Sequence, residues 1–243
     1  MDLSGKNALI TGGAVRVGRA ITLALANAGC NVFIHYGHSV TSAEKTTIEA
    51  EAAGVRVVPG SADLADAEQV EALISNVIGS LGPLDILINS AATFGEDELA
   101  DTSVAGWDSQ LAINLRAPFI LSRDFARRLG DDRPGKIVNI VDARIYRPAG
   151  DHFAYRVSKA GLAAMTEMLA QDLAPNITVN AVALGVILAP SGKDPSFLED
   201  LAATRVPLQR PGNVEMVADN VLHLLRSDFL TGVIVRLDGG EFL

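Results

Sequence analysis

A tyrosine and a lysine stand four residues apart in this chain, at Tyr155 and Lys159. In a helix that spacing puts both side chains on one face, about one turn apart. A tyrosine with a pKa of about 10 exchanges its proton poorly at neutral pH. A neighbouring ammonium group favours the phenolate and lowers that pKa, so the pair predicts proton transfer to or from a bound substrate. A tyrosine and a lysine at this spacing are common on helix surfaces and indicate little alone. Here the pair follows the fifth predicted strand, and that position favours a catalytic role.

A glycine-containing turn runs from Thr11 to Gly18, between the first predicted strand and the first predicted helix. Gly12 permits a tight turn there, and Gly18 lets the helix approach the strand closely. The first turn of such a helix, which includes Val17, presents backbone N–H groups that bind a pyrophosphate. The alternative is an ordinary turn without a ligand, because a glycine pattern alone is a weak signal.

The end of the second predicted strand indicates which nicotinamide cofactor is used. Dehydrogenases that use NAD place Asp or Glu there to bind the ribose 2′-hydroxyl. Here residues 35–39 read His-Tyr-Gly-His-Ser, and no acid occurs before Glu44. His38 and Ser39 can donate hydrogen bonds to a 2′-phosphate, and Arg16 adds positive charge nearby. We therefore predict NADP(H); a solvated loop is the alternative explanation for the histidines.

Two further segments follow predicted strands and are expected to line the cofactor. Asp63 and Leu64 come just after the third strand, where an aspartate can contact the edge of the adenine. Capping of a helix that begins near residue 66 explains Asp63 almost equally well. Small residues follow the fourth strand, as a backbone that passes close to a cofactor requires: Asn89, Ser90 and Ala91.

The scaffold that positions these residues is predicted from short apolar runs that alternate with longer amphipathic ones. The apolar runs indicate strands at 8–10, 31–34, 55–58, 84–88, 136–141, 177–182 and 233–235. Helices are expected near 17–28, 41–53, 66–80, 103–129, 154–173 and 213–226. Repeated β-α-β units imply a parallel sheet with helices on both faces, and right-handed crossovers favour a doubly wound sheet. We predict an α/β protein, a single-domain Rossmann fold over 1–243 with a seven-stranded parallel sheet.

The stretch of about 184–212 is rich in Pro, Gly and Ser and carries no predicted strand or helix. A loop of that length in a compact domain is usually a lid or a binding loop. Ligands of open α/β sheets bind beyond the carboxyl ends of the strands, where this segment begins. We predict a substrate-binding loop, with Gly185 and Ile187 next to the cofactor.

Composition argues against several classes of function. The net charge of −9 disfavours nucleic acid or an anionic membrane as the main partner, although a local positive pocket stays compatible with it. The single cysteine, Cys30, excludes an intramolecular disulfide and suits a reducing compartment. No stretch approaches the roughly 20 apolar residues of a membrane span, and the first residues lack a signal-peptide core. We expect a cytoplasmic enzyme that acts on a small molecule and needs no metal.

In order and spacing, these residues resemble the short-chain dehydrogenase/reductase family along essentially the whole chain. The matching positions are the glycine turn, Asp63, Asn89-Ser90-Ala91, Asn114, Tyr155 and Lys159. The resemblance implies a homotetramer or homodimer and hydride transfer from the nicotinamide, with Tyr155 as the proton donor. It also implies that Lys159 holds the nicotinamide ribose and that Asn114 positions a water in the proton relay.

Two positions depart from the pattern of the wider family. Arg16 stands where the family has the second glycine of the turn, and Asp142 stands where it has a serine. Together they resemble the pteridine reductase branch, which includes dihydromonapterin reductase-like proteins. Phe94 fits the aromatic residue with which that branch stacks a pterin against the nicotinamide.

The chemistry of a pterin agrees with these three residues. Arg16 can donate to the ring carbonyl, and Phe94 can stack on the ring. Asp142 can accept from ring nitrogens or supply protons through Tyr155. Each residue also has a structural alternative. Phe94 can pack a loop, Arg16 can bind phosphate alone, and Asp142 can form a salt bridge to Arg144 or Arg147.

The sequence thus predicts NADPH-dependent reduction of a C=N bond in a dihydropterin-like heterocycle. The first alternative is a carbonyl reductase such as 3-oxoacyl-acyl-carrier-protein reductase. The second is an NADP(H)-binding sensor or scaffold without turnover, against which the joint presence of Asn114, Tyr155 and Lys159 counts. Ser90, Ala92 and the Leu184-Gly185 pair differ from the commoner residues of the branch and leave the exact heterocycle open.

Overall fold

The fold is taken from a computed structural model that describes residues 1–130, 133–190, 194 and 196–243. Within these residues, seven strands form one parallel sheet in the order β3-β2-β1-β4-β5-β6-β7. The strands are β1 (Asn7–Thr11), β2 (Asn31–Tyr36), β3 (Val57–Ser61), β4 (Ile86–Asn89), β5 (Gly135–Asp142), β6 (Ile177–Leu184) and β7 (Ile234–Leu237). The order of the strands reverses between β1 and β4, which is where doubly wound sheets bind ligands. The predicted Rossmann fold is confirmed.

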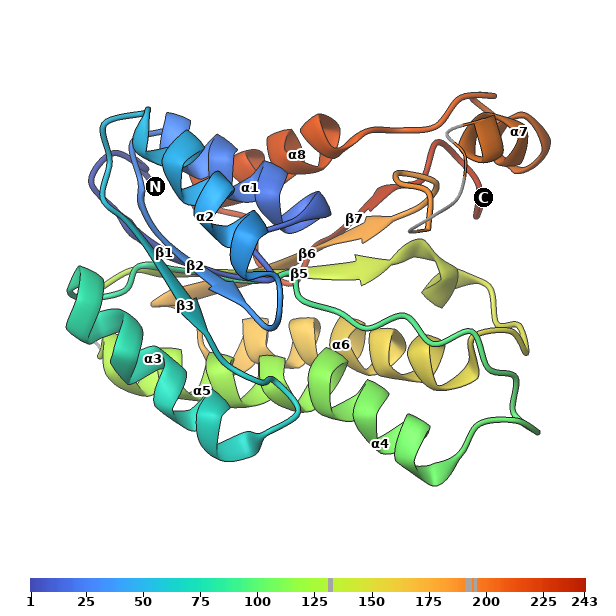
Figure 1. The fold of residues 1–243 in the computed structure, drawn as a ribbon, viewed down its shortest axis with the longest axis horizontal. Helices are drawn as coiled ribbons and strands as arrows, with labels where there is room; N and C mark the ends of the chain where they lie inside the picture. Colours follow the sequence, from blue (N-terminus) through green and yellow to red (C-terminus); the bar gives the residue numbers. More distant parts are fainter. Residues whose placement is uncertain (131–132, 191–193, 195) are drawn as a thin grey trace.

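Helices cover both faces of the sheet (Figure 1). One face carries α1 (Arg16–Asn27), α2 (Val40–Glu51) and α8 (Val214–Arg226). The other carries α3 (Ala67–Leu81), α4 (Val104–Leu111), α5 (Ala117–Leu129) and α6 (Phe153–Asp172). Each layer of helices therefore encloses an apolar core of its own against the sheet.

The strands alternate their side chains between these two cores. Ile10 and Ile88, which pair in the register of β1 and β4, pack with α1 and α8. Their neighbours Leu9 and Leu87 point to the opposite face and pack with α3 and α5. A strand buried on both sides reads as a continuous apolar run, which is why the sequence predicted its place within a few residues.

Two predicted elements differ from the structure. The single helix expected over 103–129 is divided into α4 and α5 by a π-helical turn, Ala112–Arg116. The stretch 184–212, expected to be irregular, contains the helix α7 (Ser196–Arg205). Phe197 and Leu201 are spaced as in a helix, but the Pro and Gly residues on either side of α7 are typical of a loop, so no helix was predicted.

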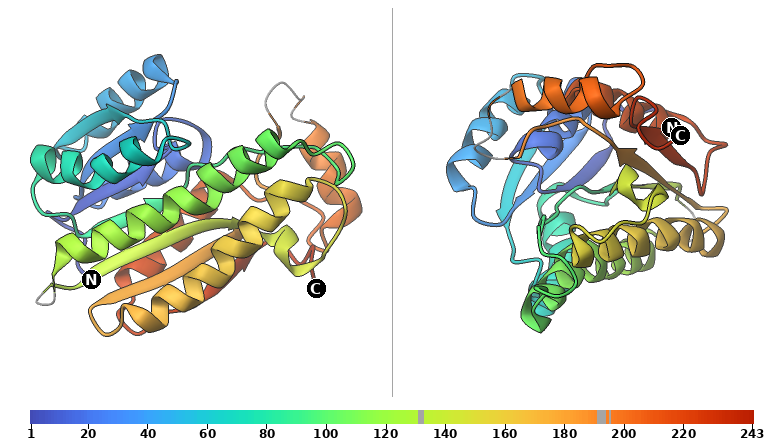
Figure 2. Two further views of the ribbon diagram at one scale, coloured as in Figure 1. Left: turned by 90° about the horizontal axis from the view of Figure 1, so that it is seen from below. Right: turned by 90° about the vertical axis from the view of Figure 1, so that its right-hand side faces the viewer.

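The carboxyl ends of the strands, α7 and the C-terminus lie at one end of the molecule, and the N-terminus lies at the other (Figures 1 and 2). The predicted site residues follow the carboxyl ends of β1 to β6, so this end carries the candidate site. Among the helices that the structure describes, none is long and apolar enough to cross a membrane.

Candidate active site

Tyr155 and Asp142 are in direct contact. The Tyr155 hydroxyl donates a hydrogen bond of 2.9 Å to Oδ2 of Asp142, the last residue of β5. The other carboxylate oxygen accepts from the backbone N–H of Arg144 at 2.8 Å and so caps the short turn Ala143–Tyr146. No ion pair among the described residues joins Asp142 to Arg144 or Arg147, so the salt-bridge alternative for this carboxylate is wrong.

Burial raises the pKa of Tyr155 well above its usual value, and the charge and hydrogen bond of Asp142 raise it further. The net direction is therefore opposite to the one that a neighbouring ammonium group alone would produce. The Lys159 ammonium group donates to the Ile140 carbonyl at 2.8 Å and lies 6.0 Å from the centre of the Tyr155 ring. Burial lowers the pKa of Lys159 to about 8. In the protein alone, the phenol keeps its proton at neutral pH and the carboxylate accepts its hydrogen bond.

Asn114 is fully buried in the π-helical turn between α4 and α5. Its amide nitrogen donates to the Thr93 carbonyl and to the Ser158 hydroxyl, both at 3.0 Å, and its oxygen accepts from the Thr93 N–H at 2.9 Å. These bonds hold the segment after β4 against α6, the helix of Tyr155 and Lys159. No hydrogen bond among the described residues joins Asn114 to either of those two side chains.

The ring of Phe94 stands next to the tyrosine. Its centre lies 4.7 Å from that of Tyr155 in an edge-on arrangement, and the ring is 41% exposed, which leaves surface for a ligand. His152 packs against the same ring with centres 4.4 Å apart, and its Nδ1 is hydrogen-bonded to the Gly95 carbonyl at 2.8 Å. Arg144 places its guanidinium carbon 5.3 Å from the Phe94 ring centre. His152 had no sequence signal except its place three residues before Tyr155.

Arg16 occupies a backbone conformation that favours glycine. Its φ of +52° lies in the left-handed region, which costs a side chain about 1 kcal/mol. The side chain is exposed and donates from Nη2 to the carbonyl of Ala189, at 2.9 Å, in the segment after β6. Arg16 thus links the glycine turn to the predicted substrate-binding loop.

The glycine turn is held from two sides. Gly12 has a φ of +64°, and a Cβ on Gly18 would fall on the Gly12 carbonyl oxygen. The Gly12 N–H donates to Nδ1 of His35 at 3.2 Å, and Nε2 of that histidine is bonded to the Ala62 carbonyl at 3.0 Å. Burial lowers the pKa of His35 and keeps the ring neutral, as a ring that accepts on one nitrogen and donates on the other requires. His35 therefore supports the turn, a role that the sequence did not indicate.

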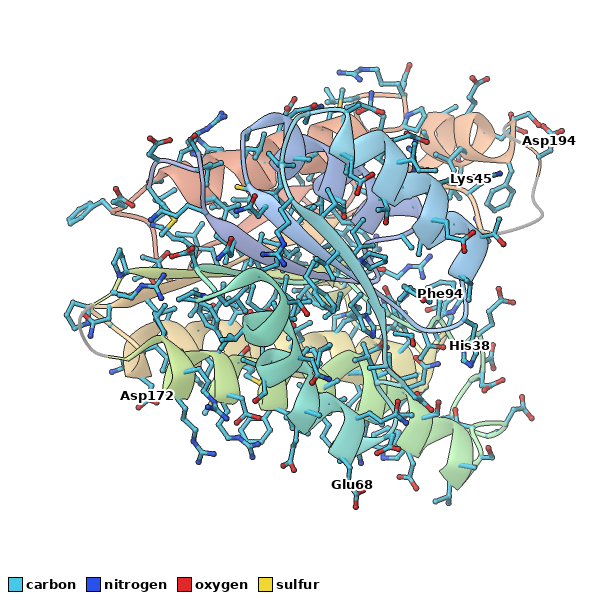
Figure 3. All side chains as sticks on the ribbon, turned by 60° about the vertical axis from the view of Figure 1, so that its left-hand side comes forward. His38, Lys45, Glu68, Phe94, Asp172 and Asp194 are labelled. Atoms are coloured by element: carbon cyan, nitrogen blue, oxygen red, sulfur yellow. The ribbon has the colours of Figure 1, made fainter. Side chains whose placement is uncertain are left out.

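His38 and Ser39 are exposed beyond the carboxyl end of β2. In Figure 3, His38 lies at the same end of the molecule as Phe94, whereas Asp172 at the end of α6 lies at the opposite end. His38, Ser39 and the exposed Arg16 offer hydrogen bonds and positive charge that suit a 2′-phosphate. The first turn of α1 offers backbone N–H groups that suit a pyrophosphate.

Asp63 is exposed beyond β3, and its side chain accepts from the Ala65 N–H at 2.9 Å. The N-cap of α3 is Asp66, which accepts from two N–H groups of the helix, so the capping alternative for Asp63 is wrong. Leu64 and Ile187 are buried in the apolar cores, so only their backbone groups are available to a cofactor. Gly185 packs closely against Asp238, because a Cβ atom on Gly185 would lie 2.7 Å from the Cα atom of Asp238.

The residues after β4 are tied to the end of β1. The N–H groups of Ser90 and Ala91 both donate to the Thr11 hydroxyl, at 3.0 and 3.1 Å. Asn89 is buried and donates to the Asn139 side chain at 2.8 Å, which links β4 to β5. The side chain of Asn89 thus stabilises the sheet, whereas Ser90 and Ala91 contact the residue that begins the glycine turn. The described residues include no cluster of three or more His, Cys, Asp or Glu that could hold a metal ion.

Comparisons with known proteins match nearly the whole chain. A family model described as Enoyl-(Acyl carrier protein) reductase matches residues 13–241. The 3-oxoacyl-[acyl-carrier-protein] reductase FabG of Staphylococcus aureus is 32% identical over 98% of this chain and 98% of its own length. A crystal structure of FolM alternative dihydrofolate reductase 1 from Brucella canis, complexed with NADP, superposes with a TM-score of 0.92 and is 33% identical. That comparison covers all of this chain and 96% of the other. A short-chain dehydrogenase from Burkholderia cenocepacia in complex with NADP superposes equally well, with a TM-score of 0.92 and 33% identity over all of both chains.

Proposed function

This chain is an NADP-dependent oxidoreductase of the short-chain dehydrogenase/reductase family, and we propose that it reduces the C=N bond of a dihydropterin-like heterocycle. The observation that carries the proposal is the 2.9 Å hydrogen bond between Tyr155 and Asp142. A carboxylate accepts hydrogen bonds from the N–H groups of such a ring, whereas it repels the oxygen of a ketone. Asp142 therefore suits a nitrogen heterocycle better than a ketone.

The cofactor supplies a hydride to the ring carbon when it is bound. The backbone of the glycine turn, with Val17, would hold its pyrophosphate. Arg16, His38 and Ser39 would bind the 2′-phosphate. Asp63, and the backbone of Leu64, would contact the adenine. Lys159 would hold the nicotinamide ribose, and the segments at 89–91 and 185–187 would line the nicotinamide.

Tyr155 would give its proton to the ring nitrogen, so that C=N becomes CH–NH as the hydride arrives at the carbon. Asp142 orients that proton before transfer and, because its charge disfavours the phenolate, drives the tyrosine to recover a proton from solvent. Phe94, whose side chain is partly exposed, would pack against the ring. The segment 184–212, which Arg16 contacts through Ala189, would cover the substrate.

The relatives support two different substrates. The Brucella canis neighbour is named as an alternative dihydrofolate reductase, which favours a pterin. The Staphylococcus aureus relative is named as a 3-oxoacyl-[acyl-carrier-protein] reductase, which favours a β-ketoacyl thioester. The two are about equally similar to this chain, so we base the choice on Asp142 and Phe94.

A substrate comparison tests the proposal. NADPH oxidation, followed at about 340 nm, is measured with 7,8-dihydrobiopterin, with 7,8-dihydrofolate and with acetoacetyl-coenzyme A. We expect kcat/KM for a dihydropterin to exceed that for the thioester by at least about tenfold, because only the pterin offers Asp142 a donor. Turnover of the thioester alone would overturn the proposal, and NADPH binding without turnover of any substrate would identify a binding protein.

The variant Asp142→Ser links the assay to the site. We expect kcat for the dihydropterin to fall about 100-fold, in the range of a lost acid–base group, while any thioester activity stays or rises. The melting temperature serves as the control for folding. Unchanged pterin kinetics in Asp142→Ser would remove Asp142 from the reaction. An unchanged KM for NADPH in Arg16→Gly would remove Arg16 from the phosphate site.

A further inference from the structure

A cavity of about 490 Å³ adjoins the candidate active site and is lined by four arginines: Arg144, Arg147, Arg156 and Arg205. They come from the turn after β5, from the start of α6 and from the end of α7. Two acids, Asp151 and Glu241, complete its charged wall. In Figure 1, α7 and the C-terminus, which supply Arg205 and Glu241, lie together at this end of the molecule.

Arg156 has a structural role in the wall of this cavity. Arg156 forms an ion pair of 2.6 Å with Asp151 and also donates to the carbonyls of Asp151, Arg144 and Arg147. These bonds hold the chain after β5 against α6. The charges of Arg156 and Asp151 therefore balance each other.

The charges of the other three arginines are not neutralised by ion pairs. Within the described chain, no carboxylate forms an ion pair with Arg144, Arg147 or Arg205. Nη1 of Arg144 is buried without a hydrogen-bond partner among the described residues, which is costly for a charged donor. Glu241 is the remaining acid on the wall, and the charges of Asp142 and Asp238 reach it from beside the cavity. The wall itself thus carries three guanidinium groups for one carboxylate outside the Arg156–Asp151 pair.

Arg144 lines the cavity and also contacts the site. The backbone N–H of this residue bonds to Asp142, and its guanidinium group lies beside Phe94. A substituent on a ring bound beside Phe94 would enter the cavity past Arg144. The wall of the cavity is thus locally positive on a chain whose net charge is −9, so it would attract a negatively charged group.

We propose that this cavity binds an anionic group, a carboxylate or a phosphate, carried on the side chain of the heterocyclic substrate. Arg147 and Arg205 bind the anion, and Arg144 lies between it and the ring. Arginine forks suit both anions because they bind two oxygens at once. The inference rests on the proposed function, since it extends the same substrate into a neighbouring cavity.

The test compares substrates that share a ring and differ in charge. KM and kcat are measured for 7,8-dihydrofolate, with a dicarboxylate tail, for 7,8-dihydroneopterin monophosphate, and for uncharged 7,8-dihydrobiopterin. In the double variant Arg147→Gln/Arg205→Gln we expect KM to rise at least about tenfold for one or both anionic substrates, equivalent to about 1.4 kcal/mol or more. The KM for dihydrobiopterin and all kcat values should stay within about twofold. The substrate that is affected identifies the anion as a carboxylate or a phosphate.

Arg56→Gln is the matched control, because it removes the same charge at an exposed position before β3, at the opposite edge of the sheet. An equal rise in KM for all three pterins, or no rise for either anionic one, would overturn the subsite.

A second measurement separates the subsite from the proposed function. Binding of p-aminobenzoyl-L-glutamate and of inorganic phosphate to the NADP-loaded protein is followed by titration calorimetry. Binding of either probe that weakens at least about tenfold in the double variant supports an anion subsite even if no pterin is turned over. Absent binding, or equal binding to both proteins, counts against the subsite even if pterins are good substrates.

Discussion

Tyr155 donates a hydrogen bond to Asp142, which stands where the pattern of the wider family has a serine. Since burial and Asp142 both raise its pKa, the resting state is a phenol hydrogen-bonded to a carboxylate. The single proton of the phenol lies in this bond, so a ligand that takes the proton must offer the carboxylate another donor, and a ring with neighbouring N–H and N= groups does both. A ketone oxygen takes the proton but offers no donor in return. At the scale of single residues, this contact therefore supports the proposed pterin-like substrate over a ketone.

Lys159 should make the free energy of unfolding of the cofactor-free protein depend on pH. Its pKa is about 8 in the folded protein and 10.5 as a free side chain, so between these values the unfolded chain binds more protons. Stability is therefore lost as pH falls through the folded pKa, and it rises as pH increases from about 8 to about 10.5. Relative to Lys159→Met, we expect a gain of about 2 kcal/mol between about pH 7 and about pH 10.

Urea denaturation of both proteins across that range of pH measures the effect. The variant is the control for every other titrating group, Tyr155 included. A difference between the two proteins that does not change with pH would show that Lys159 is not held in a desolvating site.

At the scale of elements, the glycine turn and α1 form one unit that depends on close approach. In Gly18→Ala the new methyl group would meet the Gly12 carbonyl, so we expect a loss of about 1–3 kcal/mol in stability together with weaker NADPH binding. Gly79→Ala is the matched control, because Gly79 lies inside α3 with open space around it. It should gain about 0.5–1 kcal/mol and leave NADPH affinity unchanged.

Urea denaturation and the fluorescence of bound NADPH report the two quantities for both glycine variants. If the two substitutions had the same effect on affinity, the turn would not be the phosphate site.

At the scale of the whole molecule, apolar side chains remain exposed on α5 and α6. Phe119 on α5 is 46% exposed, and Val157 and Met168 on α6 are 39% and 70% exposed. We predict a homodimer or homotetramer that buries part of this surface. Met168→Glu should therefore lower the molar mass in solution, measured by light scattering after size-exclusion chromatography, whereas Glu167→Gln on the same helix should not. A wild-type protein that is monomeric at micromolar concentration would contradict the prediction.

The sequence by itself determined the sheet, its helices and the glycine turn. Buried parallel strands need continuous apolar runs, and a tight turn against a helix needs glycine at Gly12 and Gly18, so both leave local signals. The spacing of Tyr155 and Lys159 is local for the same reason. The helix α7 was missed because its short apolar pattern lies among Pro and Gly residues.

Only the tertiary structure decided how distant residues meet. Asp142 reaches Tyr155 because β5 ends beside the start of α6, and Arg16 reaches Ala189 across 173 residues of sequence. His35 under the turn, His152 against Phe94, and the arginines gathered from three elements depend in the same way on the order of the strands. That order follows from the packing of the whole chain, and no local pattern of residues encodes it.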